Sequence, residues 1–145
     1  TVGGGLRSIA DIKEVLRVGA DKVCLNTAAI KDPQFIKKAS RMFGSSTIVV
    51  AIEAIREENG VYLAYTDNGR EYTGIDVFEW AQKIDELGAG EIVITSVDRE
   101  GTGQGYDSEI QKTKNGSGSF VDMFRENRSH SGSMIVLVRF QILFN

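Results

Sequence analysis

Apolar residues follow two alternating spacings along the first part of the chain, which predicts strands and helices in turn. Short apolar runs typical of strands occupy residues 22–26, 47–54 and 91–97. The run at 47–54 is almost continuously apolar, as expected for a strand covered on both faces of a parallel sheet. Between these runs the apolar residues recur every three or four positions, which predicts amphipathic helices.

Polar residues mark where each predicted helix begins. Ser8 precedes Asp11 by three residues, which is close to a capping box, and Asp32-Pro33 and Asp76 are typical helix starts. Three apolar helix faces follow from the spacing: Ile9, Ile12, Val15 and Leu16; Phe35, Ile36, Ala39, Met42 and Phe43; Val77, Trp80, Ala81, Ile84 and Leu87.

Residues 56–73 interrupt this alternation. Two strand-like runs, at 61–66 and 70–73, flank Asp67-Asn68-Gly69, a sequence typical of a β-hairpin turn. We therefore expect a hairpin inserted between the repeating units. The helical crossovers imply a parallel sheet, and the pattern alone leaves open a doubly wound sheet or a (β/α)₈ barrel. A barrel needs about 250 residues, so this chain would be roughly half of one.

The C-terminal segment departs from the pattern. Residues 113–133 are rich in Gly, Ser, Asn and charge, which predicts an irregular segment. The apolar run at 134–144 carries Arg139 and is too short to span a bilayer, so we expect a buried strand or an exposed apolar tail. The sequence therefore predicts two parts: a partial barrel over 1–112 and an irregular tail over 113–145.

Composition narrows the function classes only slightly. The net charge of -3 argues against a nucleic-acid binder, which is usually basic. Cys24 is the single cysteine, so no internal disulfide can form, and no metal-ligand cluster is present in the sequence. The chain starts at Thr1 with what resembles the end of a strand. We therefore expect an internal fragment, from which a targeting segment can be missing.

Two neighbouring strand ends carry groups that suit an anion. Gly3-Gly4-Gly5 would let backbone N–H groups approach a phosphate closely, although a triple glycine can equally be a tight turn. Asn26-Thr27 follows the next strand and can bind an oxyanion or merely cap the segment after it. Together the two ends favour one phosphate site. The glycine-rich loop at 98–107 could hold a phosphate or be a plain connection.

Glu53 is the strongest single candidate for a catalytic residue. It lies at the carboxyl end of an otherwise apolar strand, where barrel enzymes place their active sites. Desolvation favours the protonated form of a carboxyl group, which suits general acid–base chemistry. The alternative is a solvated carboxylate where the strand leaves the sheet.

Strand alternation relates four further residues. If Asn26 and Thr95 point into the barrel mouth, Lys22 and Glu91 point inward at the opposite end. Two buried charges there would have to pair. The alternative, which the pattern alone favours, is that both residues sit at the solvated rim at the bottom of the barrel. Cys24, in the middle of its strand, is expected to fill space in the core.

Four segments, taken together, resemble a known enzyme family. TVGGGLRS, ADKVCLNTAAIKDP, IVVAIEA and GAGEIVITSVDREGTGQGYD resemble consecutive pieces of the cyclase subunit of imidazole glycerol phosphate synthase, over about residues 1–112. Asn26-Thr27-Ala28-Ala29 favours the cyclase over its sibling isomerase. The resemblance implies strands 3 to 6 of a (β/α)₈ barrel, with a β-hairpin insertion after strand 5.

The resemblance also implies a reaction. A glutaminase partner supplies ammonia, and the cyclase uses it to convert a bis-phosphorylated ribulosyl aminoimidazole carboxamide nucleotide to imidazole glycerol phosphate and AICAR. This chemistry needs no metal or organic cofactor, and a cytoplasmic location is expected. The isolated chain is expected to be inactive, because strands 1, 2, 7 and 8 of the barrel would be absent.

The same resemblance assigns roles to individual residues. It implies that Glu53 is the catalytic carboxylate and that Thr95 and Glu100 line the substrate mouth. It places the substrate phosphates at Gly5, Asn26, Thr27 and Gly101, and an ammonia gate at Lys22 and Glu91.

Glu53 and Glu100 stand where the family has Asp. Each change keeps the charge and adds one methylene, and such a displacement can cost on the order of 10²-fold in rate. Two alternatives therefore stay open: a paralogue that passes ammonia to a polysaccharide sugar, and a non-catalytic half-barrel remnant.

Overall fold

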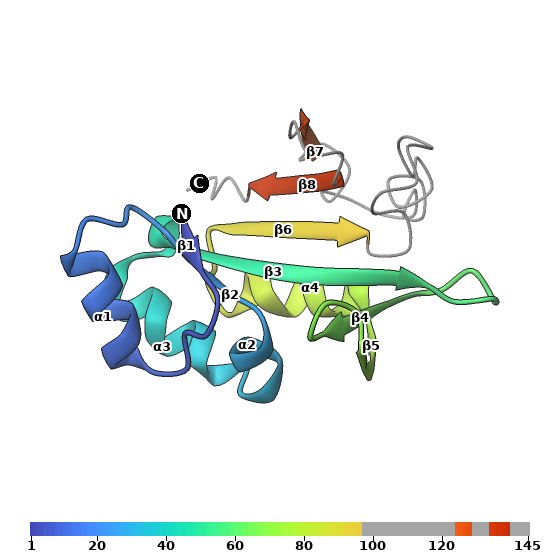
Figure 1. Ribbon diagram of the computed structural model, residues 1–145, viewed down its shortest axis with the longest axis horizontal. Helices are drawn as coiled ribbons and strands as arrows, with labels where there is room; N and C mark the ends of the chain where they lie inside the picture. The colour runs from blue at the N-terminus through green and yellow to red at the C-terminus, as the bar shows by residue number, and fades with distance from the viewer. Residues whose placement is uncertain (97–123, 129–133, 140–145) are drawn as a thin grey trace.

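One open β-sheet organises the part of the chain that the structure, a computed structural model, describes: residues 1–96, 124–128 and 134–139. Eight strands form the sheet, and its longest path runs β1-β2-β3-β6-β8-β7. The helices lie on one side of this sheet (Figure 1). The fold is therefore mixed α/β with a partly parallel sheet.

Four neighbouring strands of the sheet are parallel. They are β1 (Val2–Gly3), β2 (Val23–Leu25), β3 (Ile48–Arg56) and β6 (Glu91–Ser96). The three apolar runs in the sequence correspond to β2, β3 and β6, and each predicted bound in the described residues lies within about two residues of the observed one. Because parallel strands need helical crossovers, this part of the sheet follows directly from the alternation in the sequence.

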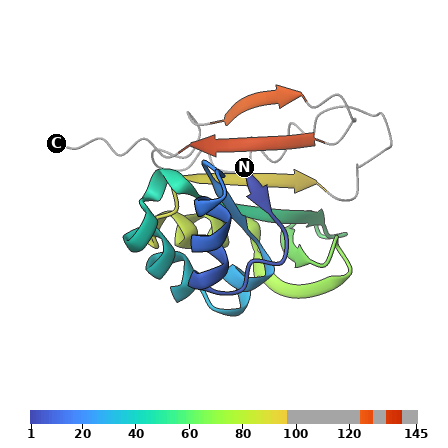
Figure 2. The ribbon, with the colours of Figure 1, turned by 60° about the vertical axis from the view of Figure 1, so that its left-hand side comes forward.

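The crossovers contain four α-helices and one 3₁₀ turn. These are α1 (Ile9–Arg17), α2 (Thr27–Lys31), α3 (Gln34–Phe43), η1 (Ser45–Thr47) and α4 (Val77–Glu86). Figure 2 shows α1, α3 and α4 gathered beneath the sheet. The sequence predicted α1, α3 and α4, but it did not predict the short elements α2 and η1.

Side-chain caps fix the first turns of α1 and α4. The Ser8 hydroxyl accepts from the Asp11 amide at 3.1 Å, and the Asp11 carboxylate accepts from the Ser8 amide at 2.8 Å. The Asp76 carboxylate accepts from the amides of Phe78 and Glu79 at 2.8 and 3.0 Å. Both predicted caps are confirmed, and each provides acceptors for amides that lack partners in the first helical turn.

Helix α3 differs from the prediction at two points. It begins at Gln34, one residue later than expected, and the Asp32 carboxylate accepts from the Gln34 amide at 3.1 Å. Met42 was expected to face the core, but this residue is 62% exposed. The prediction for Met42 was wrong because the packed face of the helix is narrower than its apolar stripe.

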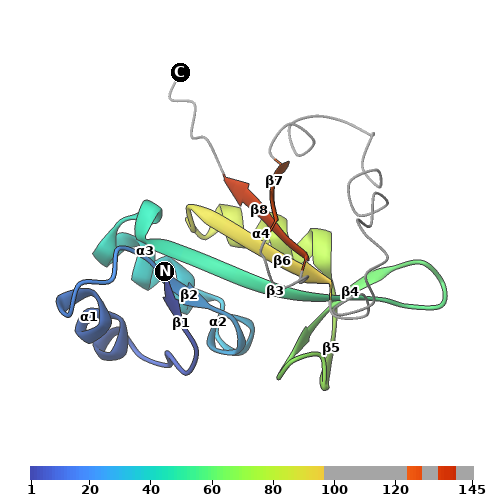
Figure 3. The ribbon, with the colours of Figure 1, turned by 45° about the horizontal axis from the view of Figure 1, so that its top comes forward.

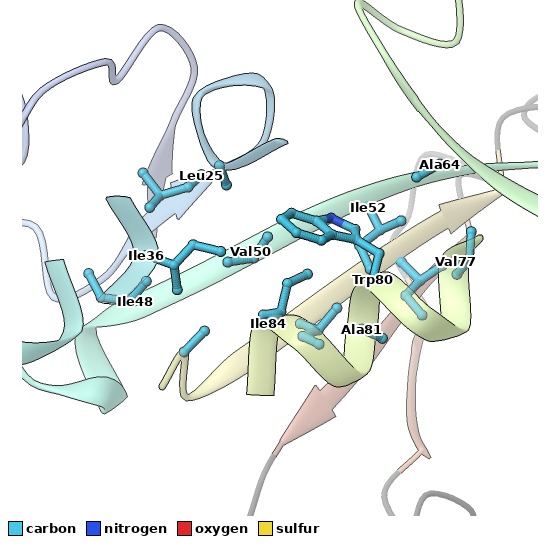
Figure 4. Close-up of a cluster of buried hydrophobic side chains, with 14 of the residues drawn as sticks. Leu25, Ile36, Ile48, Val50, Ile52, Ala64, Val77, Trp80, Ala81 and Ile84 are labelled. Atoms are coloured by element: carbon cyan, nitrogen blue, oxygen red, sulfur yellow. The ribbon is translucent and has the colours of Figure 1, made fainter. Parts of the chain in front are cut away.

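The core fills the space between the sheet and the helices. Every second residue of β3 contributes to it, and Trp80 and Ile84 of α4 cover them (Figure 4). Ile52, at the centre of this cluster, is fully buried. Because successive strand residues point to opposite faces, the residues between these core positions face away from the helices.

The predicted hairpin is present. Strand β4 (Tyr62–Thr66) pairs antiparallel with the second half of β3, beyond the residues that pair with β2. Strand β5 (Glu71–Asp76) pairs antiparallel with β4 and leads into α4. Figure 3 shows the hairpin leaving the sheet near the carboxyl end of β3. The insertion therefore lies next to the end of the strand that carries Glu53.

Two further strands extend the sheet beyond β6. Strand β8 (Met134–Arg139) pairs antiparallel with β6, and β7 (Phe124–Arg128) pairs antiparallel with β8 (Figure 2). Of the two alternatives expected for residues 134–144, a strand or an apolar tail, residues 134–139 form a strand. The expectation of an irregular segment through residue 133 was wrong for β7. The predicted boundary at residue 112 lies outside the described residues. None of the described helices has the length and apolarity to cross a membrane.

Candidate functional site

The polar candidates share the face of the sheet that points away from the helices. Val23 and Leu25 of β2 belong to the helix-side core, so Lys22, Cys24 and Asn26 alternate onto the other face. Ile92 and Ile94 of β6 also belong to that core, which places Glu91 and Thr95 on the opposite face. Glu53 lies on this face as well, because its neighbours Ile52 and Ala54 are core residues.

Glu53 is held at the carboxyl end of β3 by two donors. The Asn26 side-chain amide donates to one carboxylate oxygen at 2.8 Å. The backbone N–H of Gly69 donates to the other oxygen at 3.0 Å. The Glu53 side chain is half-buried, so this carboxylate is not simply solvated where the strand leaves the sheet. Both carboxylate oxygens are therefore hydrogen-bonded, and a catalytic role for Glu53 stays a prediction.

Asn26 does not act as a side-chain cap. It stands at the N-cap position of α2, yet its side chain makes no capping hydrogen bond. Its Nδ2 binds Glu53 instead. Its Oδ1 is buried and accepts no hydrogen bond from any residue that the structure describes. Buried polar atoms are normally paired, so this acceptor lies where a donor would be stabilising. Thr27 follows directly as the first residue of α2 and is half-buried.

Thr95 completes the group across the next strand. In the register of β3 and β6, Thr95 is the direct partner of Glu53. Side chains of direct partners lie on the same face about 5 Å apart. The structure therefore brings the ends of β2, β3 and β6 together at Asn26, Glu53 and Thr95, as the sequence predicted.

The glycine run follows β1 at the same end of the sheet. Gly3 pairs with Cys24. A Cβ on Gly3 would lie 2.9 Å from the Cβ of Cys24, which is shorter than the contact distance of two non-bonded carbon atoms. Gly4 and Gly5 have φ values of +98° and +74°, which side chains rarely adopt. The run is thus a tight turn with close strand contact. Phosphate binding by Gly5 stays a prediction.

Lys22 and Glu91 pair at the opposite end of the strands. The Lys22 ammonium donates to a Glu91 carboxylate oxygen at 2.5 Å. The Glu91 side chain is 10% exposed and that of Lys22 is 28% exposed. The two charges therefore pair, as burial would require, with Glu91 largely shielded and Lys22 partly exposed at this end of the strands. A role in admitting ammonia stays a prediction.

The remaining candidates divide into two groups. Cys24 lies in mid-strand, and desolvation by burial raises the pKa of its thiol, which is unfavourable for a nucleophile. Gly101 and Glu100, with the loop that carries them, lie outside the described residues. Within residues 1–96 and the two described C-terminal strands, no group of three side chains could hold a metal ion.

One contributor to the site was missed in the sequence. Gly69 was interpreted only as part of a hairpin turn, and its contact with Glu53 spans sixteen residues. The Asp67-Asn68-Gly69 pattern predicted the turn correctly, but nothing in the sequence shows where a turn points. The fold was needed to relate the hairpin to the carboxylate.

Comparisons with known proteins add the family context. A model of the histidine biosynthesis protein family matches residues 1–119, which extends past the predicted boundary at residue 112. The imidazole glycerol phosphate synthase subunit HisF of Legionella pneumophila is 54% identical over 112 residues, covering 77% of this chain and 53% of that protein. The subunit HisF of Prochlorococcus marinus strain AS9601 is 44% identical over 154 residues, covering 95% and 60%. The chain therefore spans about half the length of the curated relatives it matches.

Proposed function

Because the chain belongs to the histidine biosynthesis protein family, we propose that it forms part of a cyclase subunit of imidazole glycerol phosphate synthase. The complete subunit would join ammonia to a bis-phosphorylated ribulosyl aminoimidazole carboxamide nucleotide in the cytoplasm. The products would be imidazole glycerol phosphate and AICAR. A glutaminase subunit would supply the ammonia.

The arrangement of strands supports a partial barrel. The parallel strands follow one another in sequence order across the sheet, with their crossover helices on one side. A doubly wound sheet would have helices on both faces. We infer that β1, β2, β3 and β6 correspond to strands 3 to 6 of a (β/α)₈ barrel, and that β4 and β5 form the insertion after strand 5.

The contact between Asn26 and Glu53 is the observation that carries the proposed chemistry. It joins the carboxyl ends of two neighbouring parallel strands, where barrel enzymes bind their substrates. In this assignment Glu53 accepts and returns a proton at the reacting end of the substrate. Thr95 and Glu100 line the same mouth.

Phosphate binding would use groups on both sides of this contact. The amides of Gly5 and Thr27, with the side chain of Asn26, would hold one phosphate of the substrate, and Gly101 would contribute to the second. Backbone amides and neutral side chains can bind a phosphate closely without a fixed counter-charge. The residues assigned here need no metal ion or organic cofactor.

Ammonia would enter at the other end of the strands. The Lys22–Glu91 pair lies at their amino ends, on the face that the barrel would enclose. Its opening would admit a small neutral molecule, and its closure would exclude water. The glutaminase would therefore dock at the end of the barrel opposite the substrate mouth.

A chimera would test this function. The chain spans about half of its relatives, so we propose that alone it lacks activity. The 112 matched residues can replace the corresponding segment of the Legionella pneumophila subunit. Turnover of the bis-phosphorylated nucleotide with an ammonium salt then measures the contribution of this chain.

Two matched substitutions make the test specific. E53Q removes the proposed proton carrier, and E57Q makes the same change four residues further on. We expect E53Q to lower turnover by roughly 10²- to 10⁴-fold and E57Q to leave it within about threefold, because only Glu53 would transfer a proton. An inactive chimera, or equal effects of the two substitutions, would contradict the proposal.

A further inference from the structure

The β4–β5 hairpin contacts the carboxylate that the proposed function makes catalytic. We propose that this hairpin is a positioning element for Glu53, acting through the backbone amide of Gly69. The inference rests on the proposed function, because positioning matters only if Glu53 transfers a proton. It adds a role for a segment that the site assignment leaves without one.

The turn adopts a conformation that aims the amide. Asp67 and Asn68 have φ values of +54° and +56°, and Gly69 has +78°. Among the described residues, Asp67 and Asn68 are the non-glycine residues with positive φ. Asp and Asn tolerate this left-handed region better than most side chains, and Gly adopts it freely. The resulting turn directs the Gly69 N–H toward Glu53, 3.0 Å from its oxygen.

A bulge in β5 determines where this turn lies. The register between β4 and β5 shifts between Ala64 and Tyr65, which leaves Thr73 and Gly74 as extra residues on β5. The Thr73 hydroxyl donates to the Ala64 carbonyl and accepts from the Ile75 amide at 3.2 Å. A bulge bends its strand and increases the local twist. Thr73 therefore stabilises the bend that brings the tip of the hairpin onto the polar face of the sheet.

Two donors from different elements then restrict the carboxylate. Asn26 approaches from the end of β2 and Gly69 from the hairpin, and each binds a different oxygen. With both oxygens held, rotation of the carboxylate is opposed in either direction. Proton transfer requires hydrogen-bond geometry within a few tenths of an ångström, so a second donor is a functional gain for a side chain as long as Glu.

Nuclear magnetic resonance on the chain itself can test this contact. A long-range HNCO experiment detects coupling through a hydrogen bond from the Gly69 nitrogen to the Glu53 carboxylate carbon. The hydrogen-exchange rate of the Gly69 amide gives a second readout. T73V removes the hydroxyl that holds the bulge at nearly constant volume, and T73S keeps the hydroxyl as the matched control.

The expected results separate positioning from simple folding. The unaltered chain and T73S should show the coupling and slow exchange of the Gly69 amide. E53Q should make that amide exchange faster, because a neutral acceptor binds it more weakly than a carboxylate. T73V should lose the coupling and exchange the Gly69 amide roughly tenfold faster, as expected for one lost hydrogen bond. In the chimera, T73V should lower kcat with little change in KM. T73S, which keeps the hydroxyl, should have a kcat close to that of the unaltered chimera.

Three outcomes would overturn the inference. The first is a Gly69 amide whose exchange rate is unchanged by E53Q. The second is a T73V chain that keeps the coupling, and the third is a T73V chimera with unchanged kcat. If T73V does not fold, the E53Q result decides. An inactive chimera with intact Gly69–Glu53 coupling would reject the proposed function while leaving the contact established, so the two failures are distinguishable.

Discussion

The hydrogen bond between Asn26 and Glu53 stabilises the fold by more than the substitution Asn26→Ala should reveal. Asn26→Ala removes the bond of 2.8 Å from Nδ2 to the Glu53 carboxylate. Hydrogen bonds to charged groups contribute about 1.5–3 kcal/mol, and both side chains are half-buried, so we take the lower end, roughly 1–2 kcal/mol. If this bond were the one interaction lost, Asn26→Ala would lower the free energy of unfolding by the same amount, roughly 1–2 kcal/mol.

Removal of the buried side-chain oxygen of Asn26 offsets part of this loss. Within the described part of the chain its Oδ1 is buried without a hydrogen bond, and such an atom costs about 1 kcal/mol or more. Asn26→Ala removes this unfavourable term together with the favourable bond. We therefore expect the single substitution to lower the free energy of unfolding by less than about 1 kcal/mol, while the interaction with Glu53 keeps its larger value.

A double-mutant cycle separates the two terms. Urea unfolding followed by circular dichroism would be measured for the unaltered chain, N26A, E53A and the double variant. The cycle should give a coupling free energy of roughly 1–2 kcal/mol in favour of the pair. A coupling below about 0.3 kcal/mol would refute the reasoning, because distant independent sites already deviate from additivity by that much.

Three further predictions concern other contacts. K22M removes the ammonium 2.5 Å from the buried Glu91 carboxylate and should lower the free energy of unfolding in urea by about 2 kcal/mol. This is less than the loss expected for a fully buried pair, because the Lys22 side chain is 28% exposed. An unchanged free energy of unfolding would contradict this. The hydrogen bond to Glu57 raises the pKa of the Tyr65 phenol above its usual 10.0, so its stabilising contribution is complete below that pH and is lost as the pH rises through the raised value. E57Q should lower this pKa in an ultraviolet titration, and an unchanged midpoint would count against the assignment. Cys24, whose thiol pKa is raised by burial, should react with iodoacetamide at least roughly tenfold more slowly in the folded than in the urea-unfolded chain, and equal rates would show that the thiol is accessible.

Local sequence features predicted the repeating part of the fold. The strands β2, β3 and β6 are short apolar runs whose burial is decided by their own residues. The caps at Ser8 and Asp76 depend on contacts no more than three residues apart. Such features follow from propensity and periodicity, so the order of strands and helices could be predicted before the fold was known.

Features decided by tertiary contacts were harder to predict. The apolar stripe of α3 includes Met42, but what lies against a helix depends on its neighbours, and Met42 is exposed. Strand β7 is polar and charged, so its sequence lacks the apolar alternation of a strand, and pairing with β8 defines it instead. The short helix α2 has too few residues for a periodicity to be visible.

The candidate site was predicted in its location more fully than in its contacts. Alternation along parallel strands placed Asn26, Glu53 and Thr95 on one face, because it depends only on the period of a strand. The donor at Gly69 could not be predicted, because it depends on a bulge at Thr73 that redirects a distant turn. The sequence predicts which strand ends meet, and the hairpin geometry decides how the carboxylate is held.

Titration of the labelled chain with imidazole glycerol phosphate, followed in ¹H–¹⁵N spectra, tests most directly whether the carboxyl ends of these strands form a phosphate site. Saturable shifts should appear at the amides of Gly5, Asn26 and Thr27, and N26A should weaken binding at least roughly tenfold, as expected for loss of a hydrogen bond to a charged group. An absence of shifts at these residues, or shifts concentrated at the Lys22–Glu91 end of the sheet, would contradict the account.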